Sequence, residues 1–576
     1  MAPVRRGLFG ALLDRLVGWK SSLVPETTDY TTERFRIPVG ENVYLAADLY
    51  QPLQPKPPKG TILIRTPYGI GIPMAIAHAR PLAARGYQVL LSSCRGTDES
   101  DGELDPGRHE AADGQAVVAW MREQPWYTGS FAAVGASYIG YVQWALLSEN
   151  PPADFRAAAI YTGPHDMGKF IWGTGALDYG AFSWADFTTR QKRGDGQLSL
   201  MLALRSQQAT LGPIFESLPL MGAVDKYFQD AYATAMPPWL GKTLAIADLG
   251  DKYWTPINHG DALQKANLPI LLTAGWYDLV LPQVMEQYEI LSQRGCDVAL
   301  TIGPWTHLQA GTGFNILSDT YDWFEEHFTS LPRKRLRKAP VRVFVTGMNK
   351  WLDLPKWPPE PASHEELFFS PDKSLVADKP GESNIPDSTF TFDPEKPTPF
   401  VGTPPLFDRG VGQRKPDTAL ATRHDVLSFT TTSPLEHDLE VCGKPVVSLH
   451  HSSDHPHVDL LVILSEVDPA GVSRPVSQRY MRLGNNQESG VAVAVPPTAE
   501  KRIELLDCAH LFRRGNRLRV MIAGGSHPRY LRNLGTGEHH ATSERMEKAV
   551  HSVGHRAGAE SRLILPLTKV ESEAVE

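Results

Sequence analysis

Three side chains of this 576-residue chain have the types and the order that nucleophilic catalysis needs. Ser137 lies in residues 131–140, FAAVGASYIG, which predict a short apolar strand, a tight turn and the start of a helix, with the serine at the turn. A serine hydroxyl is a weak nucleophile at neutral pH and needs a base to take its proton. The usual base is a histidine that a carboxylate holds in one tautomer. His307 and Asp278 fit these two roles, because each follows a predicted buried strand.

The turn at Ser137 departs from the common nucleophile motif. In Gly-x-Ser-x-Gly the serine stands on a strand-to-helix turn at the top of an α/β-hydrolase sheet. Gly135 fits this pattern, but the second glycine comes one position late, at Gly140. Each residue also has an ordinary interpretation: a buried serine at a βα turn, an aspartate that caps a helix, and a solvated loop histidine. The order Ser, Asp, His and the positions at carboxyl ends of strands together favour a catalytic triad.

The elements that must position these residues alternate between buried strands and helices. Residues 32–50 predict a hairpin. Apolar strands are expected at 61–65, 87–91, 269–275 and 297–302, and a further one within residues 131–136 leads to Ser137. Helices are expected at 75–85, 110–123, from 138 and at 317–330. Strands that are apolar on both faces and alternate with helices predict a mostly parallel α/β sheet.

Two further regions differ in character from this sheet. Residues 163–260 lack buried strands and are rich in Trp, Phe, Leu and Met, which predicts a helical cap inserted between sheet strands. Its aromatics Phe170, Trp172, Phe182 and Trp184 either line an acyl pocket or form the core of the cap. Beyond residue 338, short strands near 340–346, 366–370, 445–450, 459–465, 504–508 and 517–522 predict a jelly-roll β-sandwich. The expected division is 1–30 (amphipathic segment), 31–162 and 261–338 (α/β core), 163–260 (cap) and 339–576 (jelly roll).

The N-terminal segment predicts an amphipathic helix. Apolar residues recur at helical spacing: Leu8, Phe9, Leu12, Leu13, Leu16 and Val17. Asp14 and Arg15 interrupt the apolar patch and no small-residue cleavage site follows, which disfavours a signal peptide. We expect the helix to pack on its own domain, with contact to a membrane surface as the alternative.

Composition excludes several classes of function. The net charge of −8 argues against a nucleic-acid binder. The four cysteines are widely spaced and include no Cys-x-x-Cys pair, which favours a cytoplasmic, reducing compartment and no zinc site. No run approaches the ~20 apolar residues of a membrane span. Residues 450–457 hold four histidines, but their spacing matches no zinc pattern, so we expect a solvated loop and no metal.

Several short sequence motifs along the chain match those of a known protein family. They are residues 65–68 (RTPY), 95–96 (RG), 100–103 (SDGE), 124–126 (QPW), 135–140 (GASYIG), 275–278 (GWYD), 303–307 (GPWTH), 527–530 (HPRY) and 533–537 (NLGTG). The sequence resembles the cocaine-esterase/nonactin-hydrolase family, which is related to the X-Pro dipeptidyl peptidases and the α-amino-acid ester hydrolases. The late glycine at Gly140 is typical of this family.

The resemblance implies a fold, a mechanism and a set of roles. It implies an α/β-hydrolase core, an inserted helical cap and a C-terminal jelly roll. Ser137 would be the nucleophile, His307 the general base and Asp278 its orienting acid. The backbone N–H of Tyr138 and the phenol O–H of Tyr68 would form the oxyanion hole, and an acyl-enzyme would form with no metal or organic cofactor.

The residues after Asp278 bear on the substrate. Amino-ester hydrolases of this group carry acidic residues there to bind an ammonium, whereas this chain has Leu279, Val280 and Leu281. Relatives also carry an aspartate where Ser93 stands. The apolar run favours a neutral ester, or an amide, as the small-molecule substrate. The alternatives are an X-Pro dipeptidyl peptidase and a binding protein with a decayed hydrolase core, and a homo-oligomer is left open.

Overall fold

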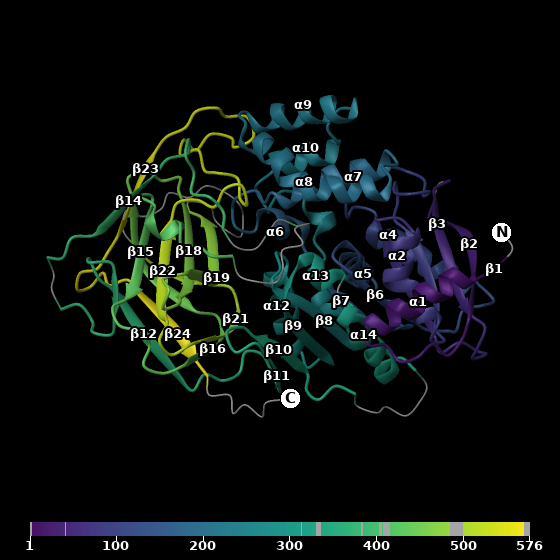
Figure 1. Ribbon diagram of the computed structural model, residues 1–576. Coiled ribbons are helices and arrows are strands. Elements are labelled where there is room, and N and C mark those ends of the chain that lie inside the picture. The colour runs from purple at the N-terminus through teal and green to yellow at the C-terminus, as the bar shows by residue number, and fades with distance from the viewer. Residues whose placement is uncertain are drawn as a thin grey trace. The chain divides into compact units, whose positions relative to one another are not determined.

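The structure is a computed structural model, and it describes residues 3–40, 42–312, 314–329, 336–381, 384–401, 406, 415–483 and 499–568. The chain forms two compact units (Figure 1). Unit 1 comprises Met1–Met167, Asp186–Met201 and Trp254–Arg342, and unit 2 comprises Gly168–Ala185, Leu202–Tyr253 and Val343–Glu576. The five-part division expected from the sequence stays a prediction.

Unit 1 is built on a mixed sheet with the strand order β1-β2-β3-β5-β4-β6-β7-β8-β9. The strands are β1 (Val4–Arg5), β2 (Tyr30–Pro38), β3 (Tyr44–Pro52), β4 (Thr61–Thr66), β5 (Gln88–Ser93), β6 (Phe131–Ala136), β7 (Phe155–Tyr161), β8 (Ile270–Tyr277) and β9 (Val298–Thr306). The first three pair antiparallel, and those from β5 to β9 pair parallel. The predicted hairpin and the predicted mostly parallel sheet are therefore present.

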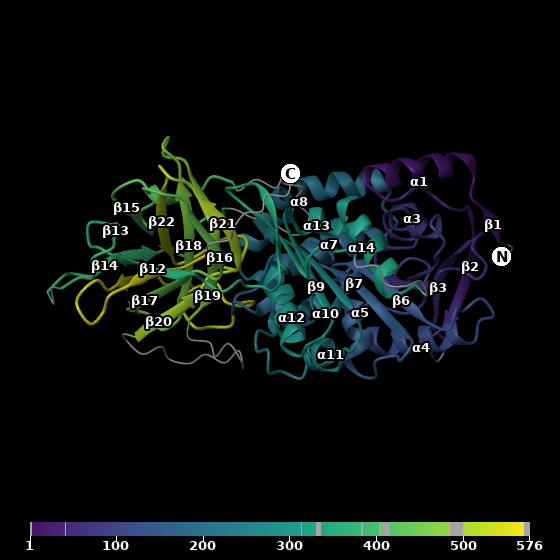
Figure 2. The ribbon, with the colours of Figure 1, turned by 90° about the horizontal axis from the view of Figure 1, so that it is seen from below.

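Helices cover both faces of this sheet. They are α1 (Leu8–Lys20), α2 (Ile72–Met74), the π-helical turn η1 (Ala75–Ala79), α3 (Arg80–Ala83), α4 (Glu110–Arg122), α5 (Tyr138–Ser148), the 3-10 turn η2 (Thr255–Ile257), α11 (Asp261–Lys265), α12 (Leu281–Gln293), α13 (His307–Thr312) and α14 (Phe314–His327). α4, α5, α11 and α12 lie on one face, whereas α3 and α14, with α1 packed outside them, lie on the other (Figure 2).

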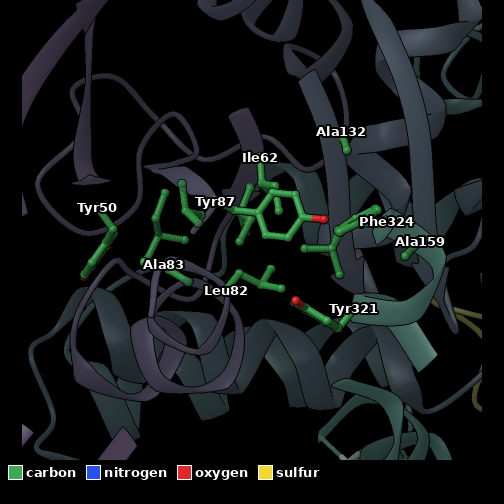
Figure 3. Close-up of a cluster of buried hydrophobic side chains, with 14 of the residues drawn as sticks. Tyr50, Ile62, Leu82, Ala83, Tyr87, Ala132, Ala159, Tyr321 and Phe324 are labelled. Atoms are coloured by element: carbon green, nitrogen blue, oxygen red, sulfur yellow. The ribbon is translucent and has the colours of Figure 1, made fainter. Parts of the chain in front are cut away.

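An apolar core joins the sheet to α3 and α14 (Figure 3). The ring of Tyr87, which precedes β5, stacks on Phe328 with a centroid separation of 6.2 Å, and its hydroxyl donates to Glu325 at 2.8 Å. Gly60, just before β4, has no side chain because a Cβ there would overlap the ring of Phe328. Buried aromatic rings contribute large apolar areas, so this cluster holds the strands whose carboxyl ends carry the candidate site.

The orientation of α1 differs from the sequence-based expectation. The helix forms where predicted, but its apolar side chains Leu8, Phe9 and Leu12 are exposed, whereas Asp14 is buried. The helix packs on its own domain, as expected, but it does so through the face that carries Asp14, because a buried charge network fixes that face.

Helices occupy the interval between β7 and β8, as predicted. They are α6 (Met167–Trp172), α7 (Gly180–Lys192), α8 (Gln197–Glu216), α9 (Leu220–Tyr232) and α10 (Pro238–Ala245). Within unit 2, the indole N–H of Trp172 donates to the carbonyl of Thr243 at 2.9 Å, and Phe182 packs edge-on against Tyr227. Because Trp172 and Phe182 are buried in these contacts, they form part of the core of the cap.

The C-terminal part of unit 2 is rich in strands around a second apolar core. The strands from residue 341 onward are β10 (Val341–Val345), β11 (Lys350–Leu354), β12 (Ser363–Phe369), β13 (Ser374–Val376), β14 (Ser388–Phe392), β15 (Val426–Thr431), β16 (Leu439–Gly443), β17 (Val446–Ser453), β18 (Asp459–Val467), β19 (Ser473–Arg482), β20 (Ala499–Glu504), β21 (Cys508–Phe512), β22 (Arg517–Ala523), β23 (Ala549–Val553) and β24 (Arg562–Leu567), with one 3-10 turn, η3 (Leu420–Thr422). The strand predicted near 504–508 is wrong, because β20 ends at Glu504, β21 begins at Cys508, and residues 505–507 join the two. Their polar backbone is bonded outside that run, for example from the Leu505 N–H to the carbonyl of Pro445 at 2.9 Å.

Candidate active site

Ser137 stands alone between β6 and α5, on a strained turn. Its φ of 57° and ψ of −122° lie outside the regions that a serine prefers, and such a conformation costs about 1–3 kcal/mol. Backbone hydrogen bonds hold it there: its N–H donates to the carbonyl of Tyr161 at 2.8 Å, and its carbonyl accepts from Gly140 and Tyr141 at 2.9 Å. A strained serine between a strand and a helix is how an α/β-hydrolase presents its nucleophile.

The two glycines of the motif, Gly135 and Gly140, are required by two different close contacts. A Cβ at Gly135 would overlap the side chain of Ile139, so the glycine lets the first turn of α5 fold back on β6. A Cβ at Gly140 would lie 2.9 Å from the Cα of Gly163 and 3.0 Å from the side chain of Ile160. The late glycine therefore serves the close approach of α5 to β7 and the residues after it.

Asp278, His307 and Ser137 form a continuous chain of contacts. His307 Nε2 lies 2.9 Å from Ser137 Oγ, and His307 Nδ1 lies 2.9 Å from Asp278 Oδ1. Asp278 Oδ1 also accepts the N–H of Val280 at 2.8 Å, which fixes the carboxylate. Asp278 and His307 are both buried. This geometry matches that of a serine, a general base and an orienting carboxylate in a catalytic triad.

The ends of β8 and β9 place the acid and the base side by side. Both strands run further than predicted, so that Asp278 directly follows β8, and His307 is the first residue of α13. The pairing shifts register between Gly275 and Tyr277. A Cβ at Gly275 would overlap the backbone of Trp305, so a glycine is needed where the two strand ends crowd together.

A buried polar network surrounds the hydroxyl of Tyr138, the residue after Ser137. The Tyr138 hydroxyl accepts the N–H of Gly107 at 2.7 Å and donates to Glu110 Oε1 at 3.0 Å. Arg65 donates to Glu110 Oε2 at 2.6 Å and to its carbonyl at 2.7 Å. Burial, reinforced by the Glu110 carboxylate, raises the pKa of the Tyr138 phenol well above its usual range, so it remains a donor.

Glu110 and Gly107 are not among the site residues that the sequence predicts. The available signal was Arg65 itself: a cation at the end of an otherwise apolar strand requires a buried anion. Glu110 is separated from it by 45 residues, and no local pattern connects the two.

Tyr68 follows β4 in unit 1. Its backbone N–H donates to Thr66 Oγ1 at 3.0 Å, its carbonyl accepts from Gln191 Nε2 at 3.2 Å, and its ring lies 6.1 Å from that of Phe187. These contacts fix the backbone and ring of Tyr68. Its role in an oxyanion hole, with the backbone N–H of Tyr138, stays a prediction.

The apolar residues after Asp278 are not equally available to a substrate. Val280 and Leu281 are buried, and Leu281 opens helix α12. Leu279 is partly exposed. Of this run, Leu279 is therefore the side chain that bears on the inference about substrate charge. At the other departure from the family pattern, the hydroxyl of Ser93 bonds within its own loop, to the carbonyl of Thr97 at 3.0 Å.

The sequence predicts a solvated loop for the histidine-rich residues 450–457. This is wrong for part of the segment, because β17 extends to Ser453. His451 lies in β17, is buried, and its Nε2 lies 3.0 Å from Nδ1 of His551. Burial lowers the pKa of His451 to about 4, so the pair is neutral at pH 7. Across the described ranges, no group of three or more His, Cys, Asp or Glu side chains converges as metal ligands would.

This strand–serine–helix turn on a mostly parallel sheet, with a histidine and a carboxylate at neighbouring strand ends, defines a serine hydrolase of the α/β-hydrolase class. The profile of the X-Pro dipeptidyl-peptidase (S15) family matches residues 40–309, and that of the X-Pro dipeptidyl-peptidase C-terminal non-catalytic domain matches residues 334–564. The chain carries matches to both domains of the X-Pro dipeptidyl-peptidase family, and it is similar to the related cocaine-esterase/nonactin-hydrolase family.

Individual relatives agree with this assignment. The chain is 24% identical over 571 residues to the cocaine esterase of Rhodococcus sp. (strain MB1 Bresler), which covers 92% of this chain and 98% of the relative. A solved α-amino-acid ester hydrolase has a TM-score of 0.78 at 20% identity, over 95% of this chain and 98% of that one. A CocE/NonD family hydrolase from Staphylococcus aureus has a TM-score of 0.68 at 17% identity, over 94% of each chain. The predicted fold class and the assignment as an enzyme are confirmed.

Among the described residues, none of the helices combines the length and the apolar character that crossing a membrane requires.

Proposed function

We propose that this hydrolase cleaves neutral carboxylic esters through an acyl-enzyme on Ser137. The observation that carries the proposal is the pair of 2.9 Å contacts of His307, one to Ser137 Oγ and one to Asp278 Oδ1. His307 takes the proton of Ser137 as Oγ attacks the ester carbonyl, and Asp278 stabilises the resulting imidazolium. The tetrahedral intermediate collapses, and the alcohol leaves with the proton from His307. Water then loses a proton to His307, attacks the acyl-enzyme and releases the acid.

The oxyanion hole we propose consists of the Tyr138 backbone N–H and the Tyr68 phenol. Tyr138 is the first residue of α5, and a helix N-terminus presents N–H groups and a positive dipole end to a developing negative charge. Donors placed in this way stabilise the transition state more than the ground state.

The proposed substrate is a small molecule without a free α-amine near the acyl carbonyl. Support comes from the apolar residues after Asp278 and from the name of the Rhodococcus relative, a cocaine esterase. The family profile, which is named for X-Pro dipeptidyl peptidases, supports a second candidate, the release of X-Pro dipeptides. We also propose a cytoplasmic location, which fits the four described cysteines Cys94, Cys296, Cys442 and Cys508, none of which forms a disulfide.

A substrate panel with covalent labelling tests both candidates. Purified protein is assayed with p-nitrophenyl esters of increasing acyl length and with Gly-Pro-p-nitroanilide, and it is labelled with a fluorophosphonate. We expect labelling at Ser137 and faster turnover of the esters. Ser137→Ala should lower turnover roughly 10⁴-fold or more. Ser148→Ala, a matched change at the other end of α5, should leave labelling intact. Strong Gly-Pro cleavage with weak ester turnover would favour the peptidase, and the absence of labelling would reject both.

A further inference from the structure

Helix α1 presents a continuous apolar stripe to solvent. Its exposed apolar side chains are between 47% and 93% exposed: Leu8, Phe9, Leu12, Leu16 and Trp19. At about 100° per residue these five positions fall within an arc of about 100° on one side of the helix. The family profile begins at residue 40, so this helix lies outside the matched hydrolase region.

The opposite side of α1 is fixed to unit 1 by small residues and charge. Gly10, Asp14 and Gly18 recur one turn apart and face α3 and Arg85, which follows α3 by two residues. A Cβ at Gly10 would lie 3.0 Å from Nη2 of Arg80, and one at Gly18 would lie 2.5 Å from Nη2 of Arg85. These glycines allow the helix to approach the two guanidinium groups closely.

Asp14 is the centre of that contact. It is 1% exposed, and it lies 2.8 Å from Arg80 and 3.0 Å from Arg6. The hydroxyl of Tyr30 donates to it at 2.8 Å. Rotating the helix to bury its apolar stripe would separate Asp14 from these partners and leave buried charges unpaired, which is strongly unfavourable. The stripe is therefore held outward in the folded protein.

The charge around the stripe indicates what it contacts. On the helical wheel, Arg15 lies just outside one edge of the apolar arc and Lys20 just outside the other. From residue 3 to residue 24 the only carboxylate is Asp14, which is buried, although the whole chain has a net charge of −8. The next carboxylate, Glu26, lies 3.5 Å from Arg15, but the Arg15 side chain remains 69% exposed. A Leu/Phe/Trp face bordered by basic side chains is the composition of helices that lie in a membrane interface and is complementary to anionic headgroups.

We propose that α1 docks the enzyme on an anionic lipid surface. Leu8, Phe9, Leu12, Leu16 and Trp19 enter the boundary between headgroups and acyl chains, and Arg15 and Lys20 lie among the headgroups. The helix has 13 residues, too few to cross a bilayer, so it lies in the plane of the surface. This proposal is independent of the substrate assigned above.

Vesicle binding by the full chain tests the proposal. Flotation is measured with phosphatidylcholine vesicles and with vesicles that contain phosphatidylserine in addition. We expect binding that is stronger to the anionic vesicles and weakens with salt. The double variant Phe9→Ser, Leu12→Ser should bind about tenfold or more weakly, because it removes two apolar side chains from the contact. Arg15→Gln with Lys20→Gln should remove the preference for anionic vesicles.

Controls separate this proposal from misfolding and from a protein interface. Leu202→Ser changes a leucine of α8 that is also exposed and should leave vesicle binding unchanged. Turnover of a soluble ester should be unchanged in all of these variants. Failure of the wild type to bind either vesicle would overturn the proposal. A wild-type oligomer that the Phe9, Leu12 double variant converts to a monomer, without vesicle binding, would assign the stripe to a second copy of the chain instead.

Discussion

Replacing Glu110 by Gln tests whether a buried ion pair positions Tyr138, the residue after the proposed nucleophile Ser137. The side chains of Arg65 and Glu110 are 2% and 5% exposed and 2.6 Å apart. The other oxygen of the same carboxylate accepts the hydroxyl of Tyr138 at 3.0 Å. Glutamine has nearly the same shape and retains one acceptor oxygen, so the change removes the charge with little loss of volume.

Two effects of this change can be estimated. Removing one partner of a buried pair costs about 3–5 kcal/mol, and because glutamine retains one acceptor we expect about 3 kcal/mol of lost unfolding free energy. The Tyr138 phenol also loses a charged acceptor, which loosens the first residue of α5 and its backbone N–H. If this N–H binds the oxyanion, a loss of about 1.4 kcal/mol in the transition state lowers kcat about tenfold. KM should change little, because the oxyanion exists only in the transition state.

The same chemistry elsewhere in unit 1 provides a matched control. Glu325 Oε1 accepts from Lys59 at 2.7 Å and from the Tyr87 hydroxyl at 2.8 Å, but the side chains of this ion pair are about one fifth exposed and distant in sequence from the nucleophile turn. Glu325→Gln should cost about 1 kcal/mol or less and leave kcat unchanged. Stability is measured by guanidinium unfolding and kcat with a p-nitrophenyl ester. Equal effects of Glu110→Gln and Glu325→Gln on kcat would refute positioning of Tyr138 by Glu110.

Three further changes have defined expected outcomes. Asp278→Asn should lower kcat roughly 10⁴-fold with an unchanged circular dichroism spectrum, and a loss below a hundredfold would contradict its role as orienting acid. Gly140→Ala should cost about 1–3 kcal/mol in guanidinium unfolding, because its Cβ would lie 2.9 Å from the Cα of Gly163; unchanged stability would show that α5 can shift. Burial lowers the pKa of His78 from 6.5 to about 4, so stability should rise with pH between 4 and 6.5, with about 2 kcal/mol lost between pH 7 and pH 5. His78→Leu should reduce that loss when both proteins are unfolded at the two pH values, and an identical loss would contradict this assignment.

Strands with an apolar, β-branched composition could be predicted from the sequence. An alanine-rich strand, whose burial depends on the elements packed against it, could not. Residues 61–65 and 270–275 are β-branched and leucine-rich runs, and both are strands. β7 was not predicted, because its centre is Ala157, Ala158 and Ala159, and alanine is the strongest helix former. Alanine suits this strand because α5 approaches it closely through Gly140 and Gly163, a long-range contact that local sequence does not reveal.

For the candidate site, the order of residues could be predicted but the contacts between them could not. Ser137, Asp278 and His307 could be predicted to lie together because a parallel sheet places its carboxyl strand ends on one edge. In the structure, His307 lies 2.9 Å from both Ser137 Oγ and Asp278 Oδ1. The network of Arg65, Glu110 and the Tyr138 hydroxyl was missed, because its members come from a strand end, a helix start and the nucleophile turn. Such a network can be predicted from sequence only by assuming that a buried cation pairs with an anion elsewhere in the chain.

Helix α1 shows why the periodicity of apolar residues alone does not predict which face of a helix packs on the protein. The usual rule assigns the apolar stripe of a surface helix to the protein core. Here the residues that decide the docking are Gly10, Asp14 and Gly18, which repeat at one-turn spacing on the other side of the helix. Small residues permit close approach to Arg80 and Arg85, and the carboxylate of Asp14 between them lies 2.8 Å from Arg80. A helix with both an apolar stripe and a small, charged stripe therefore has two candidate docking faces. When the charged face is taken by the protein itself, the apolar face is left for a partner outside it.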